Sequence, residues 1–192
     1  MSNEFYMKRF IDLFLFTLSV FIFIIPMALI TIMVLLTSKG EVLYWSNRVG
    51  KNNKIFKMPK FRSMLLDTPD LATHLLANPN DYLSPIGGFL RSTSMDELPQ
   101  LFSVFKGDMT FVGPRPALFN QDDLITLRTQ KSIDKVLPGI TGWAQVNGRD
   151  GLTINEKVDF DLEYIQQQSF WFDMKILWIT IVMVVKRIGI SH

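Results

Sequence analysis

The sequence contains no cysteine and only two histidines, His74 and His192, among its 192 residues. Without cysteine, the chain can form no disulfide, no thiol nucleophile and no thiolate metal site. The two histidines lie far apart in the sequence, and one is the last residue, so a zinc site is not expected. Any metal cofactor should therefore be a hard ion bound by oxygen atoms, most simply Mg²⁺.

Several common nucleotide-binding and catalytic motifs are also absent. The sequence has no P-loop, no G-x-G-x-x-G and no H-E-x-x-H pattern. The net charge of +2 is close to balance, and the basic residues gather around one apolar segment rather than in a recognition motif. Nucleic-acid binding is therefore not expected.

That apolar segment runs from Leu13 to Leu36 without a charged residue. A helix of about 24 residues is about 36 Å long and can cross a bilayer core. Pro26 lies near its middle and should kink or break the helix. Asp12, at the start of the segment, is expected to form an interfacial ion pair with Arg9, three residues before it.

Basic residues flank this segment on both sides, which favours placing both of its ends in the cytoplasm. We therefore predict a re-entrant membrane helix hairpin, broken at Pro26, over residues 1–40. A straight span with two basic flanks is also compatible with the charges alone. The flanking residues are Lys8 and Arg9 before the segment, and Lys39, Arg48, Lys51, Lys54, Lys57, Lys60 and Arg62 after it.

Residues 41–192 are predicted to form a small cytoplasmic domain of helices and short strands, so that the fold class is α+β and membrane-associated. The last helix is predicted over 170–190, where Trp171 and Trp178 favour a position at the membrane interface, although burial against the domain is equally compatible. The other predicted elements are strands at 42–45 and 55–58 around a turn at 50–53, a loop or short helix at 67–85, a helix ended by Gly107, and strands at 109–112 and 140–146. A helix is predicted at 122–136, where Thr129 and Gln130 could interrupt it, and another is opened by a capping box of Thr153 and Glu156.

Two adjacent carboxylates, Asp96 and Glu97, stand at the predicted start of the helix that Gly107 ends. One interpretation is structural: Ser94 is the N-cap, Glu97 completes a capping box, and Asp96 complements the helix dipole. The other is chemical, because free N–H groups at a helix start can bind phosphate and keep the pKa of Asp96 low. Adjacent helical side chains point about 100° apart, so the two acids should have separate roles.

Several arginines could accompany these acids in a phosphate site. Arg115 lies between Pro114 and Pro116, which hold its backbone stiffly. Lys60 and Arg62 follow the predicted hairpin, and Arg149 follows the turn at 147–148. Each of these side chains could equally be a solvated surface charge.

The chain resembles the bacterial sugar transferase family, in particular the small PglC-like monotopic phosphoglycosyl transferases. The resemblance covers nearly the whole chain, and the ordered set of motifs is far more specific than any one of them. The matching stretches are KRFID at 8–12, KMPKFRSM at 57–64, LRSTSMDELPQL at 90–101, KGDM at 106–109, VGPRP at 112–116 and PGITGWAQVNGR at 138–149. The sequence departs from several relatives at Ile25, where they have Ser before the proline, and at Leu137, where some have Arg.

The resemblance implies transfer of a sugar 1-phosphate from a UDP-sugar to polyprenyl (undecaprenyl) phosphate with release of UMP, at the cytoplasmic face of a bacterial inner membrane. It implies that Asp96 is the nucleophile and forms a covalent phosphosugar intermediate. Asp96 and Glu97 would bind Mg²⁺, and Glu97 would also handle protons. The substrate-binding residues implied are Lys60, Arg62, Arg91, Arg115, Gln145 and Arg149.

Two other classes of function compete with this enzyme. A non-catalytic membrane scaffold could bind the nucleotide-sugar or the lipid phosphate without turnover. A Mg²⁺-dependent phosphohydrolase would use water in place of the lipid acceptor.

Overall fold

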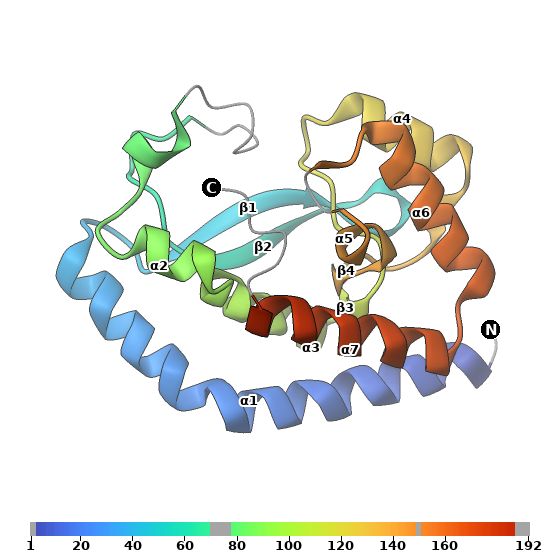
Figure 1. Ribbon diagram of the computed structural model, residues 1–192, viewed down its shortest axis with the longest axis horizontal. Helices are drawn as coiled ribbons and strands as arrows, with labels where there is room; N and C mark the ends of the chain where they lie inside the picture. The colour runs from blue at the N-terminus through green and yellow to red at the C-terminus, as the bar shows by residue number, and fades with distance from the viewer. Residues whose placement is uncertain (1–2, 70–77, 149–150, 187–192) are drawn as a thin grey trace.

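The computed structural model describes residues 3–69, 78–148 and 151–186, and combines one long N-terminal helix with a small domain of helices and short strands (Figure 1). This mixed composition confirms the predicted α+β class. The α-helices are α1 (Asn3–Thr37), α2 (Gly87–Ser92), α3 (Leu101–Lys106), α4 (Asp122–Gln130), α5 (Trp143–Val146), α6 (Ile154–Gln167) and α7 (Phe170–Lys186). The strands are β1 (Leu43–Val49), β2 (Ile55–Phe61), β3 (Thr110–Val112) and β4 (Gly139–Thr141), and the 3-10 helices are η1 (Lys51–Asn53), η3 (Pro79–Tyr82), η4 (Met95–Gln100) and η5 (Ile133–Lys135).

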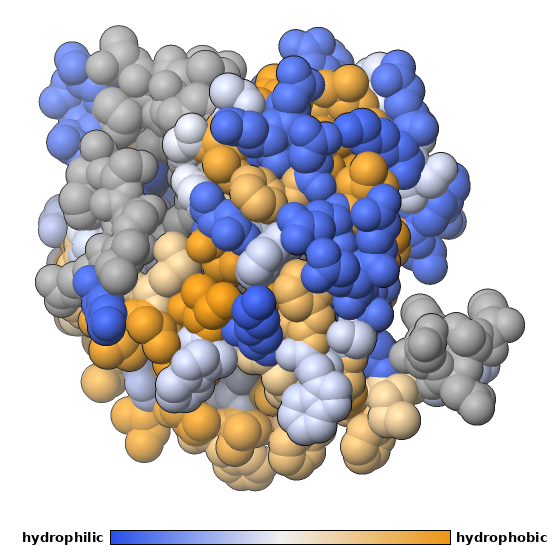
Figure 2. Space-filling model, turned by 45° about the vertical axis from the view of Figure 1, so that its right-hand side comes forward, coloured by the Kyte–Doolittle hydropathy of each residue, from blue (hydrophilic) through white to orange (hydrophobic). Residues whose placement is uncertain are grey.

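Helix α1 is 35 residues long and continues through Pro26. The helix is bent, but it does not fold back on itself (Figure 1). Its stretch Tyr6–Thr37 is long and apolar enough to cross a membrane, and α1 is the one helix of this kind in the described part of the chain. Phe10 and Phe21 are 70% and 78% exposed. Figure 2 shows apolar side chains gathered on the lower face, where α1 and α7 lie in Figure 1, and hydrophilic ones above. The re-entrant path through a membrane stays a prediction.

The first turns of α1 are bound to the domain by charged side chains. Lys8 Nζ lies 2.5 Å from Asp173 Oδ2 on α7 and 3.1 Å from the hydroxyl of Tyr164 on α6. Arg9 donates to the carbonyl oxygens of Val104 and Phe105, near the end of α3, at 2.6 and 2.7 Å. These contacts fix the N-terminal end of α1 against three separate elements.

The predicted Asp12–Arg9 ion pair is wrong. Asp12 is buried, and its carboxylate accepts hydrogen bonds from Thr110 Oγ1 at 2.8 Å and from the backbone N–H of Phe111 at 3.0 Å. Arg9 is already engaged by the carbonyls of α3. The sequence spacing within α1 is compatible with the pair, but tertiary contacts with β3 provide Asp12 with better partners.

We expect Asp12→Ala to lower stability by about 2 to 3 kcal/mol, because it leaves a buried hydroxyl and a backbone N–H on β3 without an acceptor. Asp12→Asn is the matched control, since its amide oxygen can still accept one of these bonds. The measurement is thermal unfolding in detergent. Equal unfolding temperatures for Asp12→Ala and the parent would contradict this role.

The C-terminal half of α1 also packs against the domain. Ile30 and Val34 are buried in one cluster with Phe61 of β2 and Leu90 of α2. The middle of α1 projects its apolar side chains outward, as Ile25 (70% exposed) illustrates. Both ends of the apolar helix are therefore attached to the same small domain.

The two sheets are both small. Strands β1 and β2 form an antiparallel hairpin in which Tyr44 is opposite Lys60 and Asn47 is opposite Lys57. Strands β3 and β4 are parallel, with Val112 opposite Thr141. The hairpin at 42–58, the strand at 109–112, the left-handed Gly107 (φ 92°) after α3 and the capping box of Thr153 and Glu156 all confirm local predictions.

Two predicted elements are shorter than expected. The helix predicted at 122–136 ends at Gln130, at the interruption that Thr129 and Gln130 suggested, and Ser132 adopts a left-handed conformation (φ 58°) before η5. The strand predicted at 140–146 stops at Thr141, and residues from Trp143 form the short helix α5. Parallel pairing with the three-residue strand β3 limits β4 to this length, which β propensity alone could not indicate.

Helix α7 combines buried and highly exposed apolar side chains. Ile176 is fully buried in a cluster with Val112 and Tyr164. Trp171 and Trp178, in contrast, are 78% and 67% exposed. One side of α7 is therefore buried against the domain, and the opposite side exposes its tryptophans. Each of the two alternatives for this helix describes one of its sides. The predicted C-terminal residues 187–190 lie outside the described residues.

Candidate active site

The acidic pair lies in η4, a 3-10 helix, and not at the start of the α-helix that the sequence predicts. Ser94 has a left-handed conformation (φ 55°), and its side chain forms no capping hydrogen bond. The Ser94–Glu97 capping box is therefore wrong. Pro99 follows two residues after Glu97, and its missing N–H favours a short, tight helix here over a regular α-helix.

Glu97 binds two cations instead of capping a helix. Its Oε1 atom lies 2.7 Å from Lys60 Nζ on β2 and 2.9 Å from Arg115 Nη2. Burial alone would raise the pKa of Glu97, but Arg115 and Lys60 outweigh it and hold the pKa well below its usual 4.5. Glu97 is thus a permanent anion that brings Lys60 and Arg115 to one place.

Asp96 has a different environment, although it is the next residue. It is only 8% exposed. Burial raises the pKa of Asp96 from 3.8 to about 6, against the lowering effect of Lys60 and with a further increase from the Glu97 charge. The expectation of a low pKa is therefore wrong, because loss of solvation exceeds any benefit from the short helix. At neutral pH the carboxylate is still mostly ionised, and a raised pKa makes it a stronger nucleophile.

The loop that carries Arg115 is held closely by backbone contacts. A Cβ atom at Gly139 would lie 2.2 Å from the backbone nitrogen of Gly113, and one at Gly142 would lie 2.1 Å from its carbonyl oxygen. Only glycine permits this approach. The PGITG and GPRP stretches, which are 22 residues or more apart in the sequence, therefore form one unit that positions the Arg115 side chain toward Glu97.

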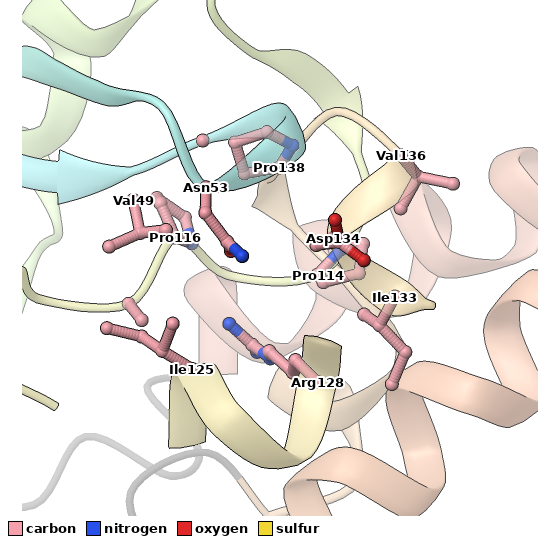
Figure 3. Close-up of a pocket in the computed structure, with 12 residues that line it drawn as sticks. Val49, Asn53, Pro114, Pro116, Ile125, Arg128, Ile133, Asp134, Val136 and Pro138 are labelled. Carbon is pink, nitrogen blue, oxygen red and sulfur yellow. The ribbon is translucent and has the colours of Figure 1, made fainter. Parts of the chain in front are cut away.

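A second arginine, Arg128, binds the backbone of the same loop. Arg128 on α4 donates from Nη1 to the backbone carbonyl of Arg115 at 2.8 Å, and from Nε and Nη2 to Asp161 Oδ2 on α6 at 2.9 and 2.6 Å. Asp161 is 1% exposed. Arg128, Pro114 and Pro116 line one cavity of about 30 Å³, and Figure 3 shows Arg128 on α4, below the loop that carries the two prolines. Neither Arg128 nor Asp161 was predicted as a site residue. The sequence signal for Asp161 is that this charged residue stands beside Val158 and Leu162 on the apolar face of α6.

The remaining predicted site residues differ in whether they contact or lie near the acidic pair. Arg91 Nη1 lies 3.2 Å from Met64 Sδ, and its charge lowers the pKa of Asp96, so it is close to the acidic pair. Arg62 donates to the carbonyl of Lys39, just after α1, at 3.1 Å, rather than to either acid. Gln145 donates to the carbonyl of Ile140 at 2.8 Å, and its buried Oε1 has no hydrogen-bond partner in the described part of the chain. Arg149 lies outside the described residues.

A magnesium ion would have few protein ligands here. Within residues 3–69, 78–148 and 151–186, no group of three or more acidic, histidine or cysteine side chains converges. Both cations of Glu97 contact Oε1, which leaves Oε2 and the Asp96 carboxylate as hard oxygen donors. Two carboxylates suit Mg²⁺ when phosphate oxygens and water complete its six ligands. The residues present therefore fit this ion in the presence of a phosphate-bearing substrate.

Comparison with known proteins gives the same family along the whole chain. The family model described as "Bacterial sugar transferase" matches residues 3–187. The chain is 38% identical over 182 residues (91% of its length) to the UDP-glucose:undecaprenyl-phosphate glucose-1-phosphate transferase of Escherichia coli K12, and 38% identical over 168 residues (78%) to the undecaprenyl-phosphate galactose phosphotransferase of Salmonella typhimurium. It covers 39% and 34% of these two longer proteins.

A relative of similar length matches as well. The chain is 38% identical over 192 residues to the uncharacterized sugar transferase EpsL of Bacillus subtilis, and the match covers 97% of this chain and 91% of that protein. The acidic pair and its two cations thus lie inside a region shared with both the longer and the shorter relatives. The chain belongs to the bacterial sugar transferase family.

Proposed function

We propose that this chain transfers a sugar 1-phosphate from a UDP-sugar to polyprenyl phosphate and releases UMP. The observation that carries the proposal is the position of a buried Asp96 carboxylate next to Glu97, which forms ion pairs with Lys60 and Arg115. The names of relatives that act on undecaprenyl phosphate support the acceptor, and one such name includes UDP-glucose. Such a transfer would be an early membrane step in building a bacterial glycan.

In the first step, an Asp96 carboxylate oxygen attacks the β-phosphorus of the donor. The bond from that phosphorus to the bridging oxygen breaks, UMP leaves with the electron pair, and an acyl phosphate links Asp96 to the sugar. In the second step, an oxygen of the lipid phosphate attacks the same phosphorus, and the Asp96 carboxylate leaves. The product is a lipid diphosphate sugar, and the enzyme returns to its starting form.

The neighbouring residues contribute charge and position. Phosphoryl transfer depends mainly on electrostatic stabilisation and alignment. Glu97 holds the side chains of Lys60 and Arg115 together, and these two cations would neutralise the diphosphate oxygens of the donor. Asp96 and Glu97 would hold Mg²⁺, which when bound would neutralise charge on the diphosphate and on the leaving UMP. Arg62, Arg91, Gln145 and Arg149 remain proposed substrate contacts.

The attachment of α1 supports a monotopic, re-entrant placement. Lys8, Arg9 and Asp12 bind the domain near one end of α1, and Ile30 and Val34 pack against it near the other. A domain that contacts both ends cannot lie on both sides of a bilayer. We therefore propose that residues 1–40 enter one leaflet and return, and that residues 41–192 lie at the cytoplasmic face of the inner membrane. The exposed Trp171 and Trp178 on α7 suit the interface beside it.

A single engineered cysteine tests this topology, because the chain contains none. We expect Ser2→Cys, at a residue outside the described ranges, to react with a membrane-impermeant maleimide only after the cytoplasmic side is opened. A cysteine replacing Glu41, an exposed residue beyond the other end of the apolar segment, should behave in the same way. Labelling of one position from outside and the other from inside would indicate a straight span instead.

The reaction itself is tested by following UMP and the sugar in separate phases. With a panel of UDP-sugars and polyprenyl phosphate, we expect UMP release together with sugar in the lipid phase. A non-catalytic scaffold releases no UMP, and a phosphohydrolase leaves sugar phosphate in water. Either result would overturn the proposed function, and the panel also identifies the preferred sugar.

We expect Arg128→Lys to reduce kcat/KM for the donor by roughly ten- to hundredfold, because lysine cannot reach both Asp161 and the Arg115 carbonyl as the guanidinium does. The matched control is Lys131→Met, which removes an exposed ion pair of 2.7 Å to Asp159 at the same α4–α6 contact but has no bond to the Arg115 loop. Steady-state kinetics with varied donor and fixed lipid provide the measurement. Equal donor kinetics in both variants would show that the contacts of Arg128 with Asp161 and with the Arg115 carbonyl do not position the Arg115 side chain.

A further inference from the structure

The two cations that we assign to the donor diphosphate already have an anionic partner within the chain. Lys60 Nζ and Arg115 Nη2 lie 2.7 Å and 2.9 Å from the same atom, Oε1 of Glu97. At these distances both contacts are charge-assisted hydrogen bonds, which are about twice as strong as neutral ones. A phosphate oxygen that binds Lys60 and Arg115 must therefore replace or weaken two strong bonds.

The surroundings of these three side chains strengthen the contacts. The side chains of Lys60 and Glu97 are 16% and 19% exposed, and that of Arg115 is 39% exposed. Partly buried charges are screened less by salt than charges on an open surface. A phosphate at Lys60 and Arg115 would also lie beside the Glu97 carboxylate, and two anions at short range repel each other. Binding of a diphosphate is thus opposed as long as Glu97 keeps this position.

The local charge balance leads to the same conclusion. The ionised carboxylates of Asp96 and Glu97 balance the two cations that Glu97 contacts. Arg91 acts electrostatically on Asp96 and adds one further positive charge. A diphosphate brings more negative charge than this one arginine can balance. Either a cation enters with the donor, or the Glu97 carboxylate moves away from its two partners.

The side chain of Glu97 can make such a move without a change in the backbone. Its two partners come from other elements, Lys60 from β2 and Arg115 from the loop after β3. Rotation about its side-chain bonds is enough to turn Oε1 away from both. Oε2 takes no part in either contact, and together with the adjacent Asp96 carboxylate it offers hard oxygen atoms to a divalent cation.

We propose that Glu97 controls access to the donor site by exchanging partners. Glu97 binds Lys60 and Arg115 until a diphosphate arrives with a divalent cation, and it then turns to that cation and leaves both side chains to the phosphate oxygens. This inference rests on the proposed function, since the diphosphate is that of the UDP-sugar. Its consequence is that the divalent cation is needed for the donor to bind tightly, and not only for the chemical step.

Isothermal titration calorimetry with UDP tests the exchange without any turnover, because UDP carries the diphosphate but no sugar. In EDTA, we expect Glu97→Gln to bind UDP at least about tenfold more tightly than the parent, because a neutral amide holds Lys60 and Arg115 less strongly. Adding Mg²⁺ should raise the affinity of the parent at least about tenfold and that of Glu97→Gln less than about threefold. Inorganic pyrophosphate should show the same pattern, and uridine, which has no phosphate, should not distinguish the two proteins.

The matched control is Asp96→Asn, which removes the same charge from the next residue but leaves both contacts of Glu97 in place. We expect its affinity for UDP in EDTA to rise less than about threefold. Equal gains in Asp96→Asn and Glu97→Gln would mean that any lost negative charge favours UDP, and would overturn the inference. Thermal unfolding shows whether each variant is folded, and Glu97→Ala replaces Glu97→Gln in the same titrations if the latter is not.

The parent titrated with Mg²⁺ separates this inference from the proposed function. If the parent binds UDP with Mg²⁺ but Glu97→Gln binds it no more tightly than the parent in EDTA, the partner exchange is wrong and the proposed reaction is unaffected. If the parent does not bind UDP with Mg²⁺, the UDP-sugar donor itself is contradicted, and the exchange with it.

Discussion

Asp96→Asn should reduce UMP release from a UDP-sugar by at least about a thousandfold, because an amide oxygen is a far weaker nucleophile than a carboxylate and cannot form the acyl phosphate. The loss should appear with donor alone as well as with donor and lipid, since the first step no longer occurs. The measurement is a luminescent or chromatographic assay of UMP over a single turnover.

The matched control for this loss is Asp159→Asn, which makes the same chemical change on α6 at a side chain that is 69% exposed. It should release UMP at the parental rate. Purification of Asp96→Asn without any wild-type protein is essential to the comparison. Turnover of Asp96→Asn within tenfold of the parent would contradict the assignment of the nucleophile.

The same substitution should make the protein more stable at neutral pH. In the folded chain burial raises the pKa of Asp96 from 3.8 to about 6, so the folded state binds this proton more tightly than the unfolded state does. Ionising Asp96 therefore costs folding free energy as the pH rises from about 4 to about 6, amounting to about 3 kcal/mol above that range. Asparagine has no proton to lose and does not incur this cost.

Thermal unfolding in detergent with EDTA, which removes divalent cations, measures the effect. At pH 7.5, Asp96→Asn should unfold roughly 6 to 12 °C above the parent. Below about pH 3 the two proteins should coincide, because Asp96 is then protonated in both the folded and the unfolded state. Asp159→Asn should stay within about 0.5 kcal/mol of the parent throughout. A difference that is independent of pH, or a less stable Asp96→Asn, would contradict the buried environment of this carboxylate.

The predicted loss of UMP release and the predicted gain in stability of Asp96→Asn have one physical cause, which is the burial of the carboxylate. A buried carboxylate is poorly solvated, and the folded state carries the free-energy cost of that lost solvation. In the proposed reaction the same poor solvation favours attack by Asp96 on the donor. Glu97 shows the opposite arrangement, since Lys60 and Arg115 hold its pKa low and keep it anionic. Adjacent residues therefore have distinct chemical properties because of which side chains surround them, and not because of their position in η4.

Local sequence signals predicted much of the fold. The hairpin of β1 and β2, the left-handed Gly107 and the capping box of Thr153 and Glu156 each depend on residues within a few positions of one another. The acidic pair to which we assign the chemistry is also proposed from its sequence motif. For these features the interactions that decide the structure are contained in a short stretch of chain.

Features that depend on distant partners could not be predicted in the same way. Asp12 binds β3, about a hundred residues away, rather than Arg9. Asp161 and Arg128 join α6 to the Arg115 loop, and neither belongs to a local motif. The raised pKa of Asp96 follows from burial by the whole domain, whereas reasoning from the helix start alone predicted the reverse. In each case tertiary packing outweighs the local preference.

Intact-mass analysis of the purified chain after mixing with UDP-sugar alone, in the absence of lipid acceptor, tests the two-step reaction most directly. Rapid acid quenching should reveal a species heavier by one sugar phosphate, peptide mapping should place it on Asp96, and added polyprenyl phosphate should remove it. Consumption of the donor with no such species at any time, or an adduct on another residue, would show that Asp96 is not the nucleophile.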